Sequence, residues 1–167
     1  MSVTIRLAVP ADALDMAEIH MRSWEAAYKD IIPASYIKEK NAGRPALWQR
    51  VITDENTTEY VIQADGKTVG LMGVGPSRDE DTGDDVYELT GLYLLPEYFR
   101  QGIGTQAMEF AFDRARGLGK KVMTVWLIAD NLNAKNFYKK FGFAEDGKSR
   151  ISKRGRIMED IRMREAL

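Results

Sequence analysis

The sequence predicts an α/β (α+β) fold, and three observations support this class. Short segments rich in β-branched and aromatic residues recur between turn residues, which is typical of strands. Segments with apolar residues three or four positions apart alternate with them, which is typical of amphipathic helices. Near the middle, a strand-like run at 87–95 leads through a glycine loop into a helical run. The length of 167 residues suits one domain, and we expect a single domain over residues 1–167.

The chain begins with a predicted strand and a predicted helix. Residues 3–9 alternate between apolar and polar side chains, which favours a strand. Pro10-Ala11-Asp12 is typical of a helix start, and this helix is expected to reach about Tyr28. Its buried side is predicted to contain Leu14, Ala17, Ile19, Met21 and Trp24.

Further short elements are predicted after Pro33, which interrupts the helical pattern. Residues 34–53 favour one or two short helices. Thr57–Ala64 and Thr68–Val74 are expected to pair as a hairpin around Asp65-Gly66-Lys67, because Asp-Gly is a strong turn signal.

The first helical region contains four aromatic residues and the only histidine. The aromatic residues either pack as a core layer or form a wall that holds a cationic amine against the ring faces. We expect the histidine to be packed or solvated within its helix. These residues are Trp24, Tyr28, Tyr36, Trp48 and His20.

Residues 78–85 carry five carboxylates. A run of like charge is typical of a solvated connector. The alternative is an electrostatic lure for polycationic molecules, because clustered charge raises the rate of encounter.

The second half predicts two strand–helix units and a closing hairpin. Pro96 ends the strand at 87–95, because proline cannot continue a sheet ladder. The helix that follows is expected to end near Gly117-Leu118-Gly119. Three more strands are predicted at 122–129, 143–151 and 157–165. A helix capped near Asn131 is expected over 134–141, after the first of these strands. A turn at 153–156 is expected between the last two strands.

Composition excludes several classes of protein and site. Basic and acidic residues nearly cancel, 24 against 25, which argues against a nucleic-acid-binding protein. The chain has no cysteine and one histidine, so we expect no disulfide framework, no thiolate or histidine metal site and no cysteine nucleophile. We expect no signal peptide and no membrane span, and therefore a cytoplasmic location.

The glycine loop predicts an anion site at residues 100–105. Glycines let a phosphate approach the unpaired N–H groups and the positive dipole end of a helix N-terminus. A plain strand-to-helix turn is the alternative. A P-loop is excluded, because no glycine precedes a Gly-Lys-Ser/Thr at the required spacing. A dinucleotide-binding Rossmann loop fits Gly102, Gly104 and Ala107, but Pro96 lies between strand and loop, and about half the chain comes first.

Two motifs resemble the GNAT superfamily of acyl-CoA N-acyltransferases. Gly102 and Gly104 match the glycine positions of motif A, R/Q-x-x-G-x-G/A, while Phe99 stands at the Arg/Gln position and is a departure. Residues 131–143 match motif B, N-x-x-A-x-x-F/L-Y-x-x-x-G-F, at every defining position. The resemblance is strong over about residues 86–145. It implies a mixed, mostly antiparallel sheet of about seven strands, splayed at its centre and flanked by about four helices.

The resemblance also implies acetyl-CoA as co-substrate, without a metal, and assigns residues to bind it. Pantetheine is expected to lie beside the central strand at Leu92, Tyr93 and Leu94 like an added strand. The pyrophosphate is expected in the glycine loop, and two asparagines are expected near the pantetheine or sulfur end. The residues assigned to these last two contacts are Arg100, Gln101, Gly102, Ile103, Gly104, Thr105, Asn131 and Asn136.

The reaction implied is direct attack of an amine on the thioester. A protonated amine is not a nucleophile, so a base is needed, and Glu88 on the central strand is our candidate. Tyr138 lies seven residues after Asn131, two turns along the same helix face, and is expected to protonate the departing thiolate. The alternatives are a strand-surface carboxylate for Glu88 and a core tyrosine for Tyr138.

The acceptor is left open by the sequence. A small-molecule primary amine, with a polyamine suggested by the acidic loop, is our first hypothesis. Acetylation of a protein N-terminus or lysine, a non-catalytic acetyl-CoA sensor and an NAD-dependent oxidoreductase are the others. The resemblance also implies a homodimer through the C-terminal strands as one arrangement. The basic segment 148–156 is left as surface, dimer contact or a site for the CoA 3′-phosphate.

Overall fold

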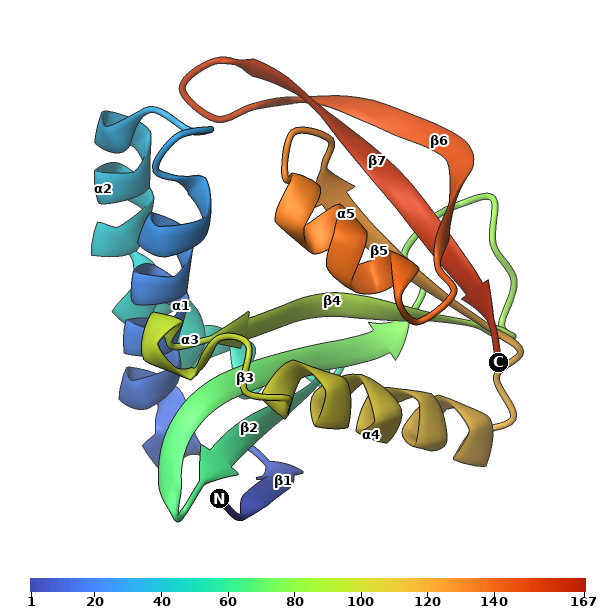
Figure 1. The fold of residues 1–167 in the computed structure, drawn as a ribbon, viewed down its shortest axis with the longest axis horizontal. Helices are drawn as coiled ribbons and strands as arrows, with labels where there is room; N and C mark the ends of the chain where they lie inside the picture. Colours follow the sequence, from blue (N-terminus) through green and yellow to red (C-terminus); the bar gives the residue numbers. More distant parts are fainter.

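The computed structural model, which describes residues 1–167, has one seven-stranded sheet in the order β1-β2-β3-β4-β5-β7-β6 (Figure 1). Every neighbouring pair is antiparallel except β4 and β5, which are parallel. The predicted mixed, mostly antiparallel sheet is therefore confirmed. The strands are β1 (Val3–Leu7), β2 (Thr58–Ala64), β3 (Lys67–Pro76), β4 (Val86–Leu94), β5 (Val122–Ile128), β6 (Ala144–Lys153) and β7 (Ile157–Ala166).

Five α-helices accompany the sheet, one more than the expected four. The segment after Pro33 gives two helices, because Gly43 ends the first and Pro45 opens the second in its first turn. None of the helices is both long enough and apolar enough to cross a lipid bilayer. The helices are α1 (Ala13–Tyr28), α2 (Ala34–Ala42), α3 (Arg44–Val51), α4 (Ile103–Gly117) and α5 (Leu132–Lys139).

The buried side of α1 differs from the prediction. Leu14 is 64% exposed, whereas Ala13, Met16 and Ala17 are buried. Pro10–Asp12 forms a separate 3₁₀ turn, so that α1 starts at Ala13 and its inward-facing stripe is set from there. Of the residues predicted to be buried, Ala17 and Ile19 are buried, whereas the prediction for Leu14 is wrong.

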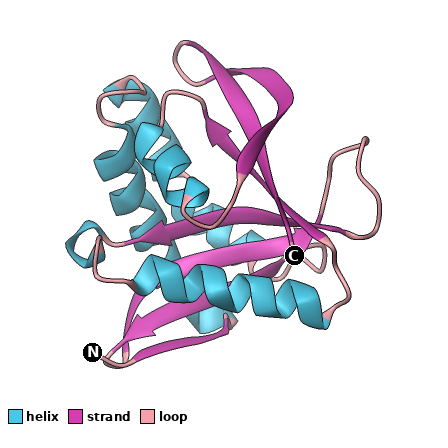
Figure 2. Cartoon of the chain, turned by 45° about the vertical axis from the view of Figure 1, so that its right-hand side comes forward, coloured by secondary structure: helices cyan, strands magenta, loops and turns pink.

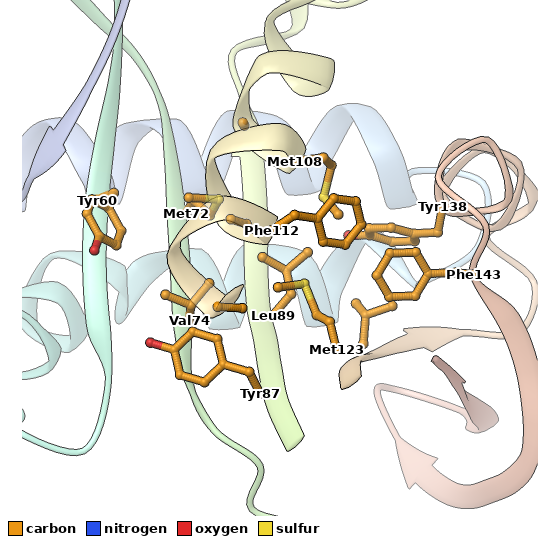
Figure 3. Close-up of a cluster of buried hydrophobic side chains, with 14 of the residues drawn as sticks. Tyr60, Met72, Val74, Tyr87, Leu89, Met108, Phe112, Met123, Tyr138 and Phe143 are labelled. Carbon is orange, nitrogen blue, oxygen red and sulfur yellow. The ribbon is translucent and has the colours of Figure 1, made fainter. Parts of the chain in front are cut away.

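Helices cover both faces of the sheet (Figure 2). The larger core lies between the sheet and helices α4 and α5, where Met108 and Phe112 pack against Leu89 and Met123 (Figure 3). The smaller core lies on the other face, where Met16 of α1 and Trp48 of α3 are buried with strand residues. A third cluster joins the α1–α2 connection and α2 to β5 and β7, and it consists of Ile32, Ile37, Ile128 and Met158.

The acidic loop 78–85 is held by one buried arginine on β7. Nη1 of Arg162 donates to Asp79 at 3.0 Å and to Asp81 at 2.8 Å, and Nε donates to Asp146 at 2.6 Å. Trp126 on β5 donates its indole N–H to Asp79 as well, at 3.0 Å. The loop is therefore anchored to the sheet, and two of its five carboxylates are already neutralised by the protein.

Replacing Arg162 with alanine should destabilise the fold strongly, because Asp79 and Asp146 would lose their charged partner in a mostly buried place. Breaking a buried ion pair in this way costs about 3–5 kcal/mol, which corresponds to a fall in Tm of roughly 10 °C for a chain of this size. Thermal unfolding followed by circular dichroism measures it. Arg164→Ala, an exposed arginine on the same strand, is the matched control and should shift Tm by less than about 2 °C. Equal shifts for both variants would contradict the anchoring role.

Candidate functional site

The centre of the sheet is splayed, as predicted. Strands β4 and β5 pair only from Val86–Leu89 against Val122–Val125. Beyond that point, β4 continues to Leu94 paired only with β3, and β5 continues to Ile128 paired only with β7. Two strand edges therefore face each other without hydrogen-bonding to one another. Such an edge presents free N–H and C=O groups to an extended ligand.

A β-bulge accompanies the start of the splay. Val74 on β3 pairs with Leu89, whereas Gly73 pairs with Gly91, which leaves Thr90 as the extra residue. A bulge bends its strand and increases the local twist. The residues of β4 before the bulge are buried and those from Thr90 onward are half-buried. The bend thus coincides with the place where β4 departs from β5.

The glycine loop has the free donors that an anion requires. None of the six backbone N–H groups from Arg100 to Thr105 donates a hydrogen bond within the protein. Arg100 and Gly102 have positive φ angles, 59° and 81°, which turn the chain tightly into α4. No side chain caps α4. The first turn of the helix and the preceding loop are therefore available to a diphosphate.

The side chains of this loop contribute less than its backbone. Gln101 donates its amide to the carbonyl of Glu97 at 2.7 Å and is turned back toward the preceding turn. Phe99, at the motif's Arg/Gln position, is 41% exposed. Gly104 faces α5, where an added Cβ would lie 3.1 Å from the Phe137 ring. This contact shows why the position favours glycine.

Tyr138 is buried, and its ring extends from α5 toward the centre of the sheet beside Phe143 (Figure 3). Burial raises the pKa of the Tyr138 phenol, and the nearby phenols of Tyr28 and Tyr93 act in the same direction. The Tyr138 hydroxyl therefore stays protonated at neutral pH, as a proton donor must.

The two asparagines of motif B are placed differently. The Asn131 side chain is buried and accepts the backbone N–H of Ala134 at 3.1 Å, so it caps α5 as predicted. The same side chain lies next to the Tyr28 hydroxyl. Asn136 is exposed, and its position two residues before Tyr138 puts it on another side of the helix. Its contact with the co-substrate stays a prediction.

A cavity of about 160 Å³ lies at the splay, on the sheet face that carries α1. Four of its lining residues are aromatic: Trp24, Tyr28, Tyr93 and Trp126. Five are charged: Arg78, Glu88, Arg150, Arg154 and Asp160. Leu89, Thr90, Leu127 and Ile128 complete the lining. The cavity thus combines flat apolar walls with several fixed charges.

Glu88 is 1% exposed and lines this cavity from β4, one residue before the last residue that pairs with β5. Its Oε1 accepts the backbone N–H of Arg78 at 3.2 Å, and its Oε2 accepts the Arg78 guanidinium. The ion pair raises the pKa of Arg78. Glu88 is therefore a buried, oriented carboxylate beside the place where β4 and β5 part, whereas its role as a base stays a prediction.

The predicted aromatic wall is divided between two roles. Trp24 and Tyr28 line the cavity, but the Arg44 guanidinium already lies 4.5 Å from the centre of the Trp24 ring. Trp48 is a core residue that donates its indole N–H to Nδ1 of His20 at 3.1 Å. Tyr36 donates to the carbonyl of Lys153 and so contacts the β6–β7 hairpin.

His20 is packed, as expected. Its ring stacks on Tyr93 with centroids 4.4 Å apart. Burial lowers the pKa of His20 to about 3, and the charge of Arg44 adds to this effect. The imidazole is therefore neutral at physiological pH and packs against Tyr93, which lines the cavity.

The β6–β7 hairpin contributes three charged residues to the cavity lining, while most of β6 is exposed, which fits the surface role considered for it. Asp160 is 2% exposed and accepts hydrogen bonds from Arg150 at 3.3 Å and from Arg154 at 2.9 Å. At the hairpin tip, Gly155 lies against Pro33 and Tyr36. From the sequence, Arg150 and Arg154 were considered only as part of the basic segment 148–156, and Asp160 was not singled out. The signal was available, since a turn at 154–156 sets the register that pairs Arg150 with Asp160.

A family model described as the acetyltransferase (GNAT) family matches residues 14–143. The chain belongs to the GNAT acetyltransferase family. It is 33% identical over 131 residues to an uncharacterised N-acetyltransferase of Bacillus subtilis, YuaI, covering 77% of this chain and 73% of that protein. It is 26% identical over 143 residues to an uncharacterised N-acetyltransferase of Methanocaldococcus jannaschii, covering 85% of this chain and 61% of the relative.

Solved structures show the same GNAT fold. The PaiA N-acetyltransferase from Thermoplasma acidophilum, solved in complex with coenzyme A, superposes over the whole of both chains with a TM-score of 0.83 at 21% identity. The ribosomal-protein-S18-alanine N-acetyltransferase from Escherichia coli gives a TM-score of 0.67 at 20% identity, over 99% of this chain and 94% of the other. Family and fold together identify this protein as an N-acetyltransferase and exclude the hypothesis of an NAD-dependent oxidoreductase.

A further, half-buried carboxylate lies near the site and was not predicted. Glu59 on β2 packs over Gly73, and a Cβ built at Gly73 would lie within 3 Å of both the Glu59 carboxylate and the Thr90 hydroxyl. Its Oε2 is buried without a hydrogen-bond partner. Burial raises the pKa of Glu59 to about 7, because desolvation outweighs the opposing effect of the nearby Thr57 hydroxyl.

This raised pKa makes Glu59 a source of pH-dependent stability. Between its usual pKa of 4.5 and about 7, the folded protein keeps a proton that the unfolded chain releases, so stability falls as pH rises through this range. Glu59→Gln should therefore raise Tm by several degrees at pH 8 and by much less at pH 4.5. Glu55→Gln, at an exposed site, should leave Tm unchanged at both values. A gain from Glu59→Gln that is the same at both pH values would contradict the assignment.

Proposed function

We propose that this protein transfers an acetyl group from acetyl-CoA to the primary amine of a small molecule, by direct attack of the amine. One observation carries the proposal: β4 and β5 part beside a cavity that holds a buried carboxylate, and β4 is followed by a loop with free backbone amides. Tyr138 and Glu88 lie on opposite faces of the sheet near the place where the strands part. Family membership and a fold neighbour with coenzyme A bound support the same co-substrate.

The residues fit acetyl-CoA in two parts. The amides of residues 100–105 would hold the pyrophosphate, with Arg100 and Gln101 at its edge. The unpaired edge of β4 at Leu92, Tyr93 and Leu94 would hydrogen-bond the amides of pantetheine as an added strand. Asn131 lies near the sulfur end, since its side chain adjoins Tyr28 in the cavity.

In this proposal, two side chains move the protons. Glu88 accepts a proton from the ammonium form of the acceptor, so that nitrogen has a lone pair for the thioester carbon. The C–N bond forms, and a backbone N–H at the β4 bulge stabilises the negative oxygen. Tyr138 gives a proton to sulfur as the C–S bond breaks, and it regains one from the nitrogen side through solvent. The products are the amide, CoA thiol and one released proton.

The shape of the cavity favours a small acceptor over a polypeptide. The hairpin tip contacts Pro33 and Tyr36, and Arg156 donates to the carbonyl of Ile31 at 2.9 Å, so the hairpin is joined to the α1–α2 connection beside the cavity. A protein N-terminus or lysine would need an open groove on this side. The name of the Escherichia coli neighbour keeps protein acetylation as the second candidate. Cytoplasmic location, a homodimer and a single domain over the full length stay predictions from the sequence.

Tyr138→Phe should lower kcat by about 100-fold, because it removes the proton donor for the leaving thiolate. The dissociation constant for acetyl-CoA, measured by calorimetry, should change by less than about twofold. Tyr60→Phe makes the same change at a buried tyrosine on β2 and should leave kcat unchanged. Weakened acetyl-CoA binding with normal turnover would contradict the role given to Tyr138.

Thr105→Asp should weaken acetyl-CoA binding by roughly 10- to 100-fold. A carboxylate in the first turn of α4 competes with the diphosphate for the same N–H groups and repels it, while it favours the helix itself. Tm should therefore be unchanged or higher. Ser35→Asp in the first turn of α2 is the control and should leave binding unchanged. Unaltered affinity in Thr105→Asp would show that the diphosphate binds elsewhere.

A further inference from the structure

The charges around the cavity do not balance. Three guanidinium groups, from Arg78, Arg150 and Arg154, line it together with only two carboxylates. Arg78 pairs with Glu88, whereas Arg150 and Arg154 share the single carboxylate of Asp160. Although burial opposes ionisation, hydrogen bonds from Arg154 and Arg150 hold the pKa of Asp160 below its usual value. The lining therefore carries one more positive than negative charge.

Arg150 has the geometry of an unfilled anion site. Its guanidinium stacks on Trp126, with Cζ 4.2 Å from the ring centre, and only its Nε donates to Asp160. Neither of its terminal NH₂ groups has a hydrogen-bond partner in the protein. The side chain is 52% exposed at the cavity mouth. The stacking on Trp126 and the Nε contact fix the plane of the Arg150 guanidinium. A guanidinium held in this way can bind a carboxylate through two parallel N–H groups.

We infer that the acceptor is a small amino acid, whose carboxylate binds Arg150 while its amine faces Glu88. The inference rests on the proposed function and names its substrate class. A cavity of about 160 Å³ has the size that holds a molecule such as benzene in another protein, so the side chain is short or flat. The aromatic walls contributed by Trp24, Tyr28 and Tyr93 suit an apolar side chain of that kind.

A polyamine is disfavoured by the same charges. Its additional ammonium groups would lie against three guanidiniums and an excess positive charge. The acidic loop that suggested a polycation has Asp79 and Asp81 bound to Arg162. The Arg44 guanidinium covers the ring face of Trp24 that an ammonium would otherwise occupy. The protein has thus already paired two of the loop carboxylates and one ring face that would attract a polycation.

The test compares acceptors that differ only in the carboxylate. Initial rates of CoA release are measured with the twenty L-amino acids, with phenethylamine and 3-methylbutylamine as the carboxylate-free forms of phenylalanine and leucine, with spermidine and with a short peptide. An amino acid should be the best acceptor, and kcat/KM for phenylalanine or leucine should exceed that of the matched amine by at least about 100-fold. Arg150→Gln should bring this ratio close to one, mainly by raising KM for the amino acid, with acetyl-CoA affinity unchanged.

Arg164→Gln, an exposed arginine on β7 outside the cavity, is the matched control and should keep the ratio. A carboxylate-free amine, spermidine or the peptide as best acceptor would overturn the inference and leave N-acetyl transfer in place. An unchanged ratio in Arg150→Gln would overturn the role of that residue. Acetyl-CoA binding without turnover of any compound would instead overturn the proposed function together with the inference.

Discussion

The partial pairing of β4 with β5 is the constraint on which the rest of the structure depends. The two strands share four residue pairs, from Val86–Leu89, and then part inside the protein. Unpaired backbone groups at such a place are costly unless a ligand or water binds them. The parting is maintained because each strand has another partner, β3 for β4 and β7 for β5, and because the bulge at Thr90 bends β4. A strand-like co-substrate tail would complete the interrupted ladder.

Guanidinium–carboxylate contacts hold the segments that surround the parting. Arg162 binds the loop after β3 to β7, Arg78 orients Glu88, and Asp160 positions two arginines of the β6–β7 hairpin. These contacts are buried or half-buried, so they fix geometry more than they add stability. A site whose charges are oriented before the acceptor arrives loses less entropy on binding. The mixture of fixed charges and aromatic walls is therefore a property of the proposed acceptor side, while the proposed acetyl-CoA side relies on backbone N–H and C=O groups.

Features that depend on a few adjacent residues could be predicted from the sequence, whereas features that depend on contacts between elements could not. The glycine loop and the Asn131 cap are local: positive φ angles at Gly102 and a helix N-terminus follow from a few adjacent residues. The register of the helix α1 was harder, because a 3₁₀ turn at Pro10–Asp12 moved its start and exposed Leu14. Glu59 was missed, since its burial results from Gly73 and Thr90 on two other strands.

The sequence by itself determined the class of fold, the family through its two motifs and the residues of the glycine loop, because these depend on short-range spacing along the chain. Only the tertiary structure decided what the acceptor side contains. Trp24 and Tyr28 come from α1, Glu88 from β4 and Arg150 from β6, and they meet because a hairpin folds back over the parted strands. No local pattern records that meeting, since each residue taken alone is an ordinary surface or core residue of its own element.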